Sequence, residues 1–218
     1  MSDRIVGIDV SYAQGNINWD AVAIDGQVKF AFIKCTEGAT VIDHRAETNA
    51  LGAGDMGLPF GYYHFAYPQH KAGDAEGEAR AFKAALDVLP PSKLGWMLDL
   101  ERNAENMGAA EYEQWVKDFI SVFDESDPAA MDQDPRRIYI YGGASFLNAV
   151  LPAGSSLSEH PLWLAQYPVR LPDISAEPAM LPSLWADWTI WQYSDQANIP
   201  GIRGMVDVNF AKAEIIIP

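Results

Sequence analysis

The chain has 218 residues, of which 49% are hydrophobic, and its formal net charge is -15. Such an acidic chain is repelled by phosphates at long range, which argues against a nucleic-acid partner. No apolar run reaches the roughly 18–20 residues that span a membrane, so we expect no membrane partner. The amino-terminal residues show no basic stretch followed by an apolar one, so we expect no signal peptide. The lone cysteine, Cys35, excludes an internal disulfide and is expected to be a small buried side chain.

Short apolar runs predict strands that are buried on both faces, and segments with helical spacing alternate with the early ones. The clearest helix is Ala109–Glu125, where aromatic and aliphatic residues recur every three or four positions. In chain order we predict strand Arg4–Val10, strand Lys29–Lys34, helix Asp43–Ala53, strand Pro59–Ala66, helix Asp74–Val88, strand Gly95–Glu101, helix Ala109–Glu125, strand Arg137–Tyr141, helix Ser145–Leu151, and strands Leu162–Tyr167, Thr189–Tyr193 and Gly204–Val208.

After about Pro152 the pattern changes, because prolines become frequent and the last strands are joined by loops. Alternation of strands and helices indicates a parallel sheet, and eight strands favour closure into a barrel of the triosephosphate-isomerase type with reduced outer helices. The alternative is an open doubly wound sheet. No repeat or low-complexity linker divides the chain, so we expect one domain over residues 1–218. The acidic insert Asp124–Pro135 is expected to be a solvated loop.

Acidic residues lie at the ends of several predicted strands. They are Asp9, Glu37, the pair Asp99 and Glu101 in the stretch MLDLE, and Asp207. In barrels of this type the carboxyl ends of the strands form one rim, so these acids are expected to meet. One acid at a strand end can simply cap a turn. Two acids on the same face of an apolar strand are costly without a use, because alternate strand residues point the same way.

A carboxylic acid that donates a proton near neutral pH must stay protonated, and burial or neighbouring negative charge raises a carboxyl pKa in that direction. Paired carboxylates in a cleft with aromatic walls are what glycoside hydrolysis requires. Aromatic side chains near the predicted rim are suited to stack on sugar rings. These are Tyr62, Tyr141, Trp163 and Trp191. His64 lies in the same aromatic strand as Tyr62, where a satisfied core histidine is also common.

Seven blocks of the sequence resemble the lysozymes of glycoside hydrolase family 25, the Chalaropsis-type muramidases. In order they are GIDVSYAQGNINW, FAFIKCTEG, GYYHFA, LDLE, LWLAQY, WQYSD and PGIRGMVDVNFA, which together cover residue 4 to about residue 212. The resemblance implies a flattened (β/α)5(β)3 barrel of eight mostly parallel strands. It also implies hydrolysis of the β-1,4 bond between N-acetylmuramic acid and N-acetylglucosamine in peptidoglycan.

The resemblance further assigns roles to single residues. It makes Glu101 the proton donor and Asp99 the second carboxylate, with Asp9 and Asp207 completing the acidic centre. It places Tyr62 near the N-acetyl group of the sugar. The other residues expected in the substrate cleft are Glu37, His64, Tyr141, Trp163, Gln166, Trp191 and Gln192. Asp99 either attacks the anomeric carbon or holds the substrate's own acetamide while the acetamide attacks, and we favour the second route with retention.

Two rival functions use the same acids. A carbohydrate-binding protein on this barrel would have lost hydrolysis, but the DLE stretch and Asp9 are intact. A metal-dependent hydrolase would use the four acids as oxygen ligands, but the histidines lack the spacing of a zinc site, so we expect no metal and no cofactor. We expect a monomer that is made in the cytosol and acts on the cell wall. It is either a phage or prophage endolysin released at lysis or a bacterial lysozyme secreted with its leader removed.

Overall fold

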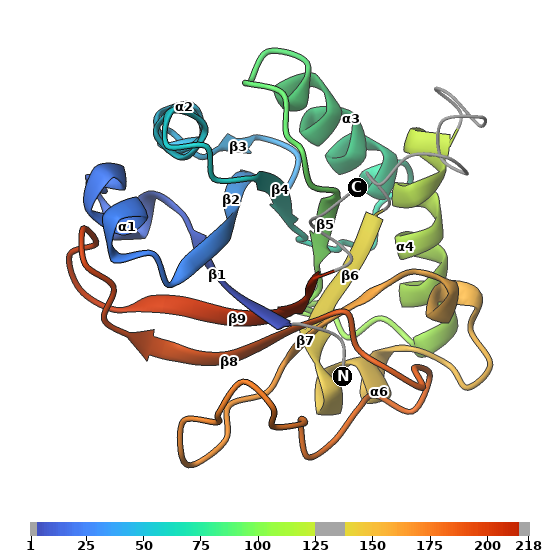
Figure 1. Cartoon of the computed structure of the whole chain (residues 1–218). Coiled ribbons are helices and arrows are strands. Elements are labelled where there is room, and N and C mark those ends of the chain that lie inside the picture. The colour runs from blue at the N-terminus through green and yellow to red at the C-terminus, as the bar shows by residue number, and fades with distance from the viewer. Residues whose placement is uncertain (1–3, 125–137, 214–218) are drawn as a thin grey trace.

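A computed structural model of the chain describes residues 4–124 and 138–213, and within them eight strands close into a barrel with a few outer helices (Figure 1). The strands are β1 (Arg4–Val10), β2 (Val28–Glu37), β4 (Phe60–Phe65), β5 (Trp96–Asp99), β6 (Ile138–Gly143), β7 (Leu162–Ala165), β8 (Ile190–Ala197) and β9 (Val206–Lys212). The barrel closes at β1, which pairs with β2 on one side and with β9 on the other.

Neighbouring strands from β1 through β8 run parallel, whereas β9 runs antiparallel to both β8 and β1. In the described residues, one helix follows each of the first five barrel strands, and loops join the last three strands. The helices are α1 (Trp19–Asp25), α2 (Ala46–Asp55), α3 (Asp74–Leu86), α4 (Ala109–Asp124) and α6 (Ala144–Val150). This is the predicted (β/α)5(β)3 order, and the open doubly wound alternative is excluded by closure.

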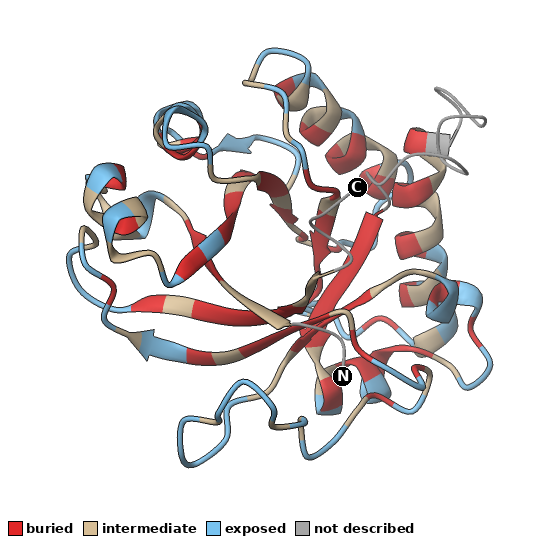
Figure 2. Cartoon of the chain, viewed as in Figure 1, coloured by how far each residue is buried: buried red, intermediate tan, exposed pale blue. Residues whose placement is uncertain are grey.

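The strands separate two apolar regions. The barrel interior is filled from alternate strand residues, among them Phe30, Phe32, Met97 and Trp163. The opposite strand faces pack under the helices. Figure 2 shows the strands largely buried, and helices α3 and α4 buried on one side and intermediate or exposed on the other. Because strand residues alternate between these two regions, neighbouring residues in a strand have different surroundings.

The helices form where the sequence has an apolar stripe. In α4 the predicted positions are all buried, and they are Tyr112, Trp115, Val116, Phe119, Ile120 and Phe123. In α3 the buried stripe consists mainly of alanines with Phe82, which lets this helix approach the barrel closely. Helices α3 and α4 pack on each other and cover the outer side of β4 and β5, where His64 lies against Phe82 and Phe119 and Trp96 lies against Phe123 (Figure 1).

Where helices are missing, a long loop covers the barrel. Residues 166–189 join β7 to β8, and Leu181 and Leu184 from this loop pack against the outer core. The Arg4 side chain at the start of β1 donates to the carbonyl of Ile174 and forms an ion pair with Glu177. The Glu177 carboxylate also accepts a hydrogen bond from the Trp188 indole. The loop therefore takes the place of an outer helix beside β8.

The predicted and observed elements differ in a few places. The seven-residue helix α1 was not predicted, because its stripe is too short to show a period between the Asn18 cap and the left-handed Gly26. The two-residue strand β3 (Val41–Ile42), which pairs with β2, carries too little pattern to predict. The predicted helix Asp43–Ala53 begins only at Ala46, because the Asp43 carboxylate accepts hydrogen bonds from Arg45 N and from Tyr12 N in the segment after β1. The insert Asp124–Pro135 lies almost wholly outside the described residues.

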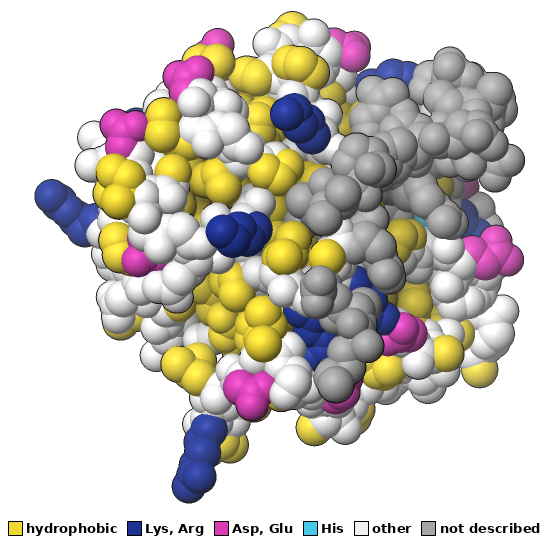
Figure 3. All heavy atoms as spheres, viewed as in Figure 1, with side chains coloured by type: hydrophobic (Ala, Val, Ile, Leu, Met, Phe, Trp, Pro, Cys, Tyr) yellow, Lys and Arg dark blue, Asp and Glu magenta, His cyan; other side chains and the backbone are white. Residues whose placement is uncertain are grey.

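Charge is spread over the face that Figure 3 draws. On the face drawn in Figure 3, acidic and basic side chains are interspersed among hydrophobic and neutral ones. Among the described residues, no helix combines the length and the apolar character that a membrane crossing requires. Cys35 is fully buried, and burial raises the pKa of its thiol to about 12, so it behaves as the expected small core side chain.

Candidate functional site

An acidic cavity of about 190 Å³ lies among side chains from all eight barrel strands and from the segments that follow β1 and β5. Its lining residues are Asp9, Ser11, Lys34, Tyr63, Phe65, Asp99, Glu101, Tyr141, Trp163, Gln192 and Asp207. Seven of the twelve predicted site residues are in this set. They are Asp9, Asp99, Glu101, Asp207, Tyr141, Trp163 and Gln192.

The direction of β9 brings Asp207 to the cavity. Asp9 lies near the carboxyl end of β1, whereas Asp207 lies near the amino end of β9. Because the two strands are antiparallel, Asp9 and Asp207 are direct cross-strand partners. Asn209, two residues further along β9, has its side chain on the same face. An acid at the start of an antiparallel strand thus meets acids at the ends of parallel strands.

Neutral amide side chains hold the buried Asp9 carboxylate. Asn209 Nδ2 donates to Asp9 Oδ2 at 2.7 Å, and Gln192 Nε2 donates to the same oxygen at 3.0 Å. Donors to the amide oxygens fix the orientation of both amides. Trp163 Nε1 donates to Asn209 Oδ1 at 2.8 Å, and Tyr141 Oη donates to Gln192 Oε1 at 2.8 Å. Each amide therefore presents its N–H groups to Asp9 and its oxygen to donors from other strands.

The carboxyls of Asp9 and Asp207 are hydrogen-bonded to each other, which requires a proton between the two groups. Burial and the negative charge of Asp9 raise the pKa of Asp207 to about 9, and the Asp207 carboxyl is hydrogen-bonded to Asp9. Burial also raises the pKa of Asp9, although hydrogen bonds from Asn209, Gln192 and Asp207 act in the opposite direction. Near neutral pH, Asp207 is the member of the pair that keeps the proton and donates it to Asp9.

Asp99 is the other deeply buried acid of the cavity, with 7% of its surface exposed. Burial raises its pKa well above the ordinary value, and the charges of Glu101 and Asp9 add to this, whereas the Lys34 ammonium opposes it. Within the described part of the chain, Asp99 Oδ1 is buried and has no hydrogen-bond partner. A buried carboxylate oxygen without a donor is costly, so it is suited to receive one from a ligand.

Glu101 lies at the exposed mouth of the cavity, two residues beyond Asp99, which is the last residue of β5. The backbone on either side of it is anchored. Leu100 N donates to the Tyr141 carbonyl at 3.0 Å, and the Arg102 carbonyl accepts from Tyr112 Oη at 2.9 Å. The Arg102 guanidinium lies 4.4 Å from the centre of the Tyr67 ring. These contacts hold Glu101 at the rim above Asp99 rather than in a free loop.

Three predicted site residues lie on the outer faces of their strands and do not line the cavity. Tyr62 is buried in the outer core with its hydroxyl donating to the Pro90 carbonyl at 2.9 Å. His64 is fully buried, and burial lowers its pKa. Its Nδ1 is hydrogen-bonded to Thr36 Oγ1 and its Nε2 to Glu78 Oε2, each at 2.8 Å. Trp191 is also buried in the outer core. In β4 the cavity wall is instead made by Tyr63 and Phe65.

Two further predicted residues lie beside the cavity rather than in it. Gln166 follows β7, and its side chain bonds to the backbone of Ala179 and Met180, so it holds the long loop in place. Glu37 ends β2 and forms an ion pair of 2.7 Å with Lys34, which does line the cavity. Glu37 belongs to an adjoining hollow that shares Lys34 with the acidic cavity.

Sequence reasoning missed Lys34, Tyr63, Phe65 and Asn209. Asn209 follows from Asp207 by strand alternation, because it lies two positions later in β9. Phe65 pairs with Asp99, so Phe65 and Tyr63 follow only once β4 is set in register with β5. Tyr167 was also missed, and its hydroxyl donates to Gln192 Oε1 at 2.6 Å, beside that of Tyr141.

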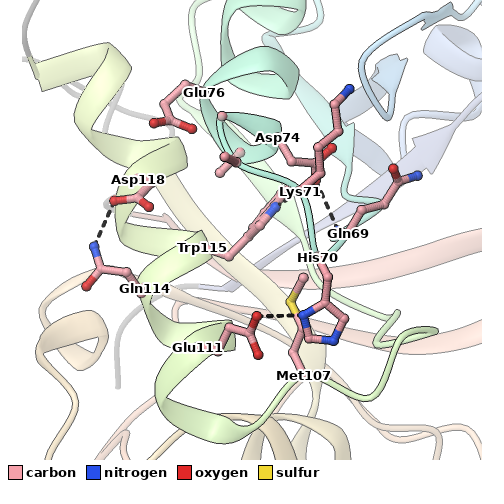
Figure 4. Close-up of a pocket in the computed structure, with 13 residues that line it drawn as sticks. Gln69, His70, Lys71, Asp74, Glu76, Met107, Glu111, Gln114, Trp115 and Asp118 are labelled. Atoms are coloured by element: carbon pink, nitrogen blue, oxygen red, sulfur yellow. Dashed lines mark hydrogen bonds and ion pairs between the residues drawn. The ribbon is translucent and has the colours of Figure 1, made fainter.

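A separate hollow of about 320 Å³ lies between the loop before α3 and helix α4 (Figure 4). His70 lies at its edge, where His70 Nδ1 is 2.6 Å from Glu111 Oε1 and His70 Nε2 is 3.2 Å from the Glu105 carbonyl. Trp115 Nε1 donates to Asp74 Oδ2 at 2.9 Å. None of these residues lines the acidic cavity, so the two hollows are distinct.

The comparison with known families decides the identity. Residues 8–202 match the model of the glycosyl hydrolases family 25. The chain belongs to this family. This family 25 hydrolase is 31% identical over 211 residues to lysozyme M1 of Streptomyces globisporus, a match that spans 94% of this chain and 67% of that protein.

Solved structures agree with the family. The bacterial lysozyme from Streptomyces coelicolor superimposes on this family 25 hydrolase with a TM-score of 0.79 at 29% identity, covering 97% of this chain and 95% of the other. The muramidase from Trichobolus zukalii gives a TM-score of 0.72 at 26% identity, covering 94% of this chain and 92% of the other. The predicted fold class and family are therefore confirmed.

Proposed function

We propose that the acidic cavity hydrolyses the β-1,4 bond between N-acetylmuramic acid and N-acetylglucosamine in bacterial peptidoglycan. Family membership and relatives named lysozyme and muramidase make the chain a glycoside hydrolase of the lysozyme type, with peptidoglycan as its substrate. The observation that carries the proposal is that Asp9, Asp99, Glu101 and Asp207 line one cavity. A binding protein without hydrolysis has no comparable support.

Glu101 is the proton donor in this proposal. It is the exposed acid of the set, so a glycosidic oxygen can reach it from the cavity mouth. As the bond between the anomeric carbon and that oxygen breaks, the proton passes from Glu101 to the leaving oxygen. Glu101 then accepts a proton from the water that attacks the anomeric carbon in the second step.

Asp99 assists the substrate's acetamide. The acetamide oxygen bonds to the anomeric carbon as the leaving group departs. The N–H of the same acetamide donates to Asp99, and this N–H becomes more acidic because the group gains positive charge. The unpartnered Oδ1 of Asp99 supports this role, since that buried atom requires a donor. Burial makes the Asp99 carboxylate a stronger base by raising its pKa, which favours acceptance of the amide proton. Water then attacks the anomeric carbon as the bond to the acetamide oxygen breaks, the amide nitrogen regains full hold of its proton from Asp99, and the product keeps the original configuration.

The pair Asp9 and Asp207 stabilises the positive charge that develops at the anomeric carbon. With one shared proton the pair carries a single negative charge near neutral pH, and Gln192 and Asn209 keep Asp9 from moving. Tyr63, Phe65 and Trp163 supply aromatic walls suited to a sugar ring. Tyr63, rather than Tyr62, is then the tyrosine of β4 that lies near the N-acetyl group of the sugar.

The biological setting follows from the substrate. Relatives with lysozyme names support action on the cell wall. We infer a monomeric catalytic domain over residues 1–218, working either as an endolysin released at lysis or as a secreted bacterial lysozyme. Analytical ultracentrifugation of the pure protein would test the monomer, because a sedimentation coefficient for twice the 24.0 kDa mass would contradict it.

The decisive experiment is cleavage of purified cell walls by the wild type and by Glu101→Gln. We expect the wild type to clear a wall suspension and to leave reducing ends on muramic acid in mass spectra. We expect Glu101→Gln to be slower by roughly 10²- to 10⁴-fold, the usual contribution of a general acid. Glu47→Gln, an exposed substitution on α2, is the control. Reducing ends on glucosamine, or full activity of Glu101→Gln, would reject the proposal.

Participation of the acetamide has its own test. A substrate with an N-trifluoroacetyl group has a poorer nucleophile in the acetamide oxygen, so its turnover should fall strongly. Asp99→Asn should be affected less than the wild type by the same change, because its acetamide contact is already impaired. Equal turnover of the acetyl and trifluoroacetyl substrates by the wild type would exclude participation.

A further inference from the structure

A buried polar group on the outer side of the barrel takes no part in the chemistry above. His64 of β4 joins Thr36 of β2 to Glu78 of α3, with 2.8 Å from its ring nitrogens to Thr36 Oγ1 and to Glu78 Oε2. All three side chains are at most 1% exposed. Polar side chains so far from water are costly unless their hydrogen bonds are made, so this group holds one geometry.

The His64 ring is neutral near pH 7. Burial lowers its pKa, although the Glu78 carboxylate acts in the opposite direction. A neutral imidazole has a single N–H, which Glu78 accepts at Nε2, while Nδ1 accepts from the Thr36 hydroxyl. The ring also packs against Phe82 and Phe119, with ring centres 5.5 and 5.0 Å away. It therefore cannot turn without losing both hydrogen bonds.

This group fixes the part of β4 that forms the cavity wall. His64 lies between Tyr63 and Phe65, which line the cavity from the opposite face of the strand. The Glu78 oxygen that faces His64 also accepts from the backbone N–H of Tyr67 at 3.0 Å. Glu78 therefore holds the chain on both sides of Phe65.

The segment that Glu78 holds is in contact with the residue after the proton donor. The Arg102 guanidinium carbon lies 4.4 Å from the centre of the Tyr67 ring. Arg102 directly follows Glu101 in the chain. A path of direct contacts therefore runs from Glu78 through Tyr67 and Arg102 to Glu101.

We propose that Glu78 is a positioning residue for the hydrolysis. With His64 it fixes the end of β4, and through Tyr67 it sets where Glu101 lies. The proposal rests on the function proposed above, in which Glu101 protonates the leaving oxygen. A displacement of about 1 Å can lower a rate on the order of 10²-fold, so a buried pair behind the strand can affect catalysis without lining the cavity.

The test uses two substrates that differ in the leaving group. One is a peptide-free tetrasaccharide of alternating N-acetylglucosamine and N-acetylmuramic acid, whose leaving sugar must be protonated. The other is the 4-nitrophenyl β-glycoside of the disaccharide that ends in N-acetylmuramic acid, whose leaving group departs as a stable anion. Because kcat/KM covers the steps up to departure, the ratio of the two values measures proton donation. A loss of folded enzyme lowers both values equally and cancels.

Glu78→Leu removes the carboxylate and fills its place with an apolar side chain. We expect kcat/KM to fall by about 10- to 100-fold for the tetrasaccharide and by less than about threefold for the aryl glycoside. Glu78→Gln keeps an oxygen for the Tyr67 N–H and should keep the wild-type ratio. Glu101→Gln is the reference for loss of the donor and should shift the ratio further in the same direction.

Tyr67→Ala tests the next contact on the path and leaves the buried pair in place. It removes a half-buried ring that lies beside Arg102 and does not line the cavity. The ratio should shift in the same direction by about three- to tenfold, the range for one cation–π contact. Tyr67→Phe keeps the ring and should behave as the wild type.

The matched control is Val22→Ala, which truncates a fully buried side chain of α1 that belongs neither to the pair nor to the cavity lining. It should lower the melting temperature, as core truncations do, and leave the ratio unchanged. Thermal unfolding of every variant sets an assay temperature at which all of them are folded.

The possible results separate the two proposals. An equal loss on both substrates in Glu78→Leu and Tyr67→Ala, or no loss, would overturn the positioning role and leave the hydrolase. An equal loss on both substrates in Glu101→Gln would reject Glu101 as the proton donor. Failure of the wild type to cleave either substrate, with walls also uncleaved, would reject the proposed function itself.

Discussion

At the scale of single residues, the hydrogen bonds around Asp9 form a closed set. Its carboxylate accepts from Gln192 and Asn209, and their amide oxygens accept from Tyr141, Tyr167 and Trp163. Each of these side chains has its hydrogen-bond partner within the set. Removing one side chain therefore leaves a buried partner without a hydrogen bond. The donors to the two amide oxygens therefore control where Asp9 lies.

Asn209→Ala tests this dependence. The substitution removes a donor from Asp9 and leaves the buried Trp163 N–H without its acceptor. We expect the free energy of unfolding in urea to fall by about 1–3 kcal/mol, the cost of an unsatisfied buried group. Wall hydrolysis should fall as well, because Asp9 loses its position. Asn148→Ala removes an exposed asparagine that bonds to Ser183 and should change neither. Unchanged unfolding of Asn209→Ala would contradict the closed set.

Asp207 makes a prediction about pH. Its pKa is about 9 in the folded protein and near 3.8 in the unfolded chain, so the stability it contributes is present below about pH 4 and is lost as the pH rises toward 9. Asp207→Asn has no proton to lose but keeps a donor for Asp9. The melting temperature of Asp207→Asn relative to the wild type should therefore rise between about pH 4.5 and about pH 8. A difference that stays constant over this range would show that Asp207 does not carry the shared proton.

At the scale of elements, the sequence predicts the strands well but does not assign their faces by itself. The apolar runs locate the barrel strands because both strand faces are buried, and for the same reason these runs give no sign of which face is inside. Tyr62 and Tyr63 are equally plausible in sequence. Their faces follow only once β4 is set in register with β5, where Tyr63 pairs with Met97.

The acids are easier to predict than the aromatics. Asp99 and Glu101 stand out in an apolar strand, and Asp207 stands out between Val206 and Val208. Aromatic residues serve both cores, so Trp163 inside the barrel and Trp191 outside it have the same local pattern. The direction of β9 is not encoded in its own residues, because it is set by pairing with β8 and β1 at long range.

Two loops next to the cavity are joined by one histidine. His70, in the loop between β4 and α3, bonds to Glu111 at the start of α4 and to Glu105 in the loop that follows Glu101. The hydrogen bond that His70 donates to the Glu111 carboxylate raises the pKa of His70, so the stabilising contribution of His70 is present below its unfolded pKa and is lost as the pH rises through the folded value.

A double-mutant cycle measures this connection. We expect His70→Gln and Glu111→Gln to show coupling in thermal unfolding below about pH 6 and none above about pH 8, because only the protonated imidazole pairs with the carboxylate. The pair is exposed, so the coupling should be small and should weaken in salt. Coupling of equal size at both pH values would mean that His70 acts as a neutral hydrogen-bonding group.

At the scale of the whole molecule, β1 is the strand that closes the barrel. It pairs with β2 and with β9, and the residues along its inner face lead from the apolar interior to the acidic cavity. Gly7 lies on that face, between Ile5 in the interior cluster and Asp9 in the cavity. The Phe30 ring occupies the space that a side chain at position 7 would fill. Closure therefore depends on the absence of a side chain at one position.

Gly7→Ala tests that dependence. A Cβ atom at position 7 would lie 2.2 Å from the nearest Phe30 ring atom, so the ring or the strand must move. We expect a loss of about 1–3 kcal/mol in urea unfolding, the usual cost of overpacking a core. Adding Phe30→Leu should make the double variant more stable than the sum of the two single losses predicts. The control, Gly77→Ala in α3, meets nothing within 4 Å and should stabilise the protein, since alanine favours a helix by roughly 0.5–1 kcal/mol. If Gly7→Ala is neutral, or if Phe30→Leu gives no relief, then the close approach of this ring to β1 does not limit closure of the barrel.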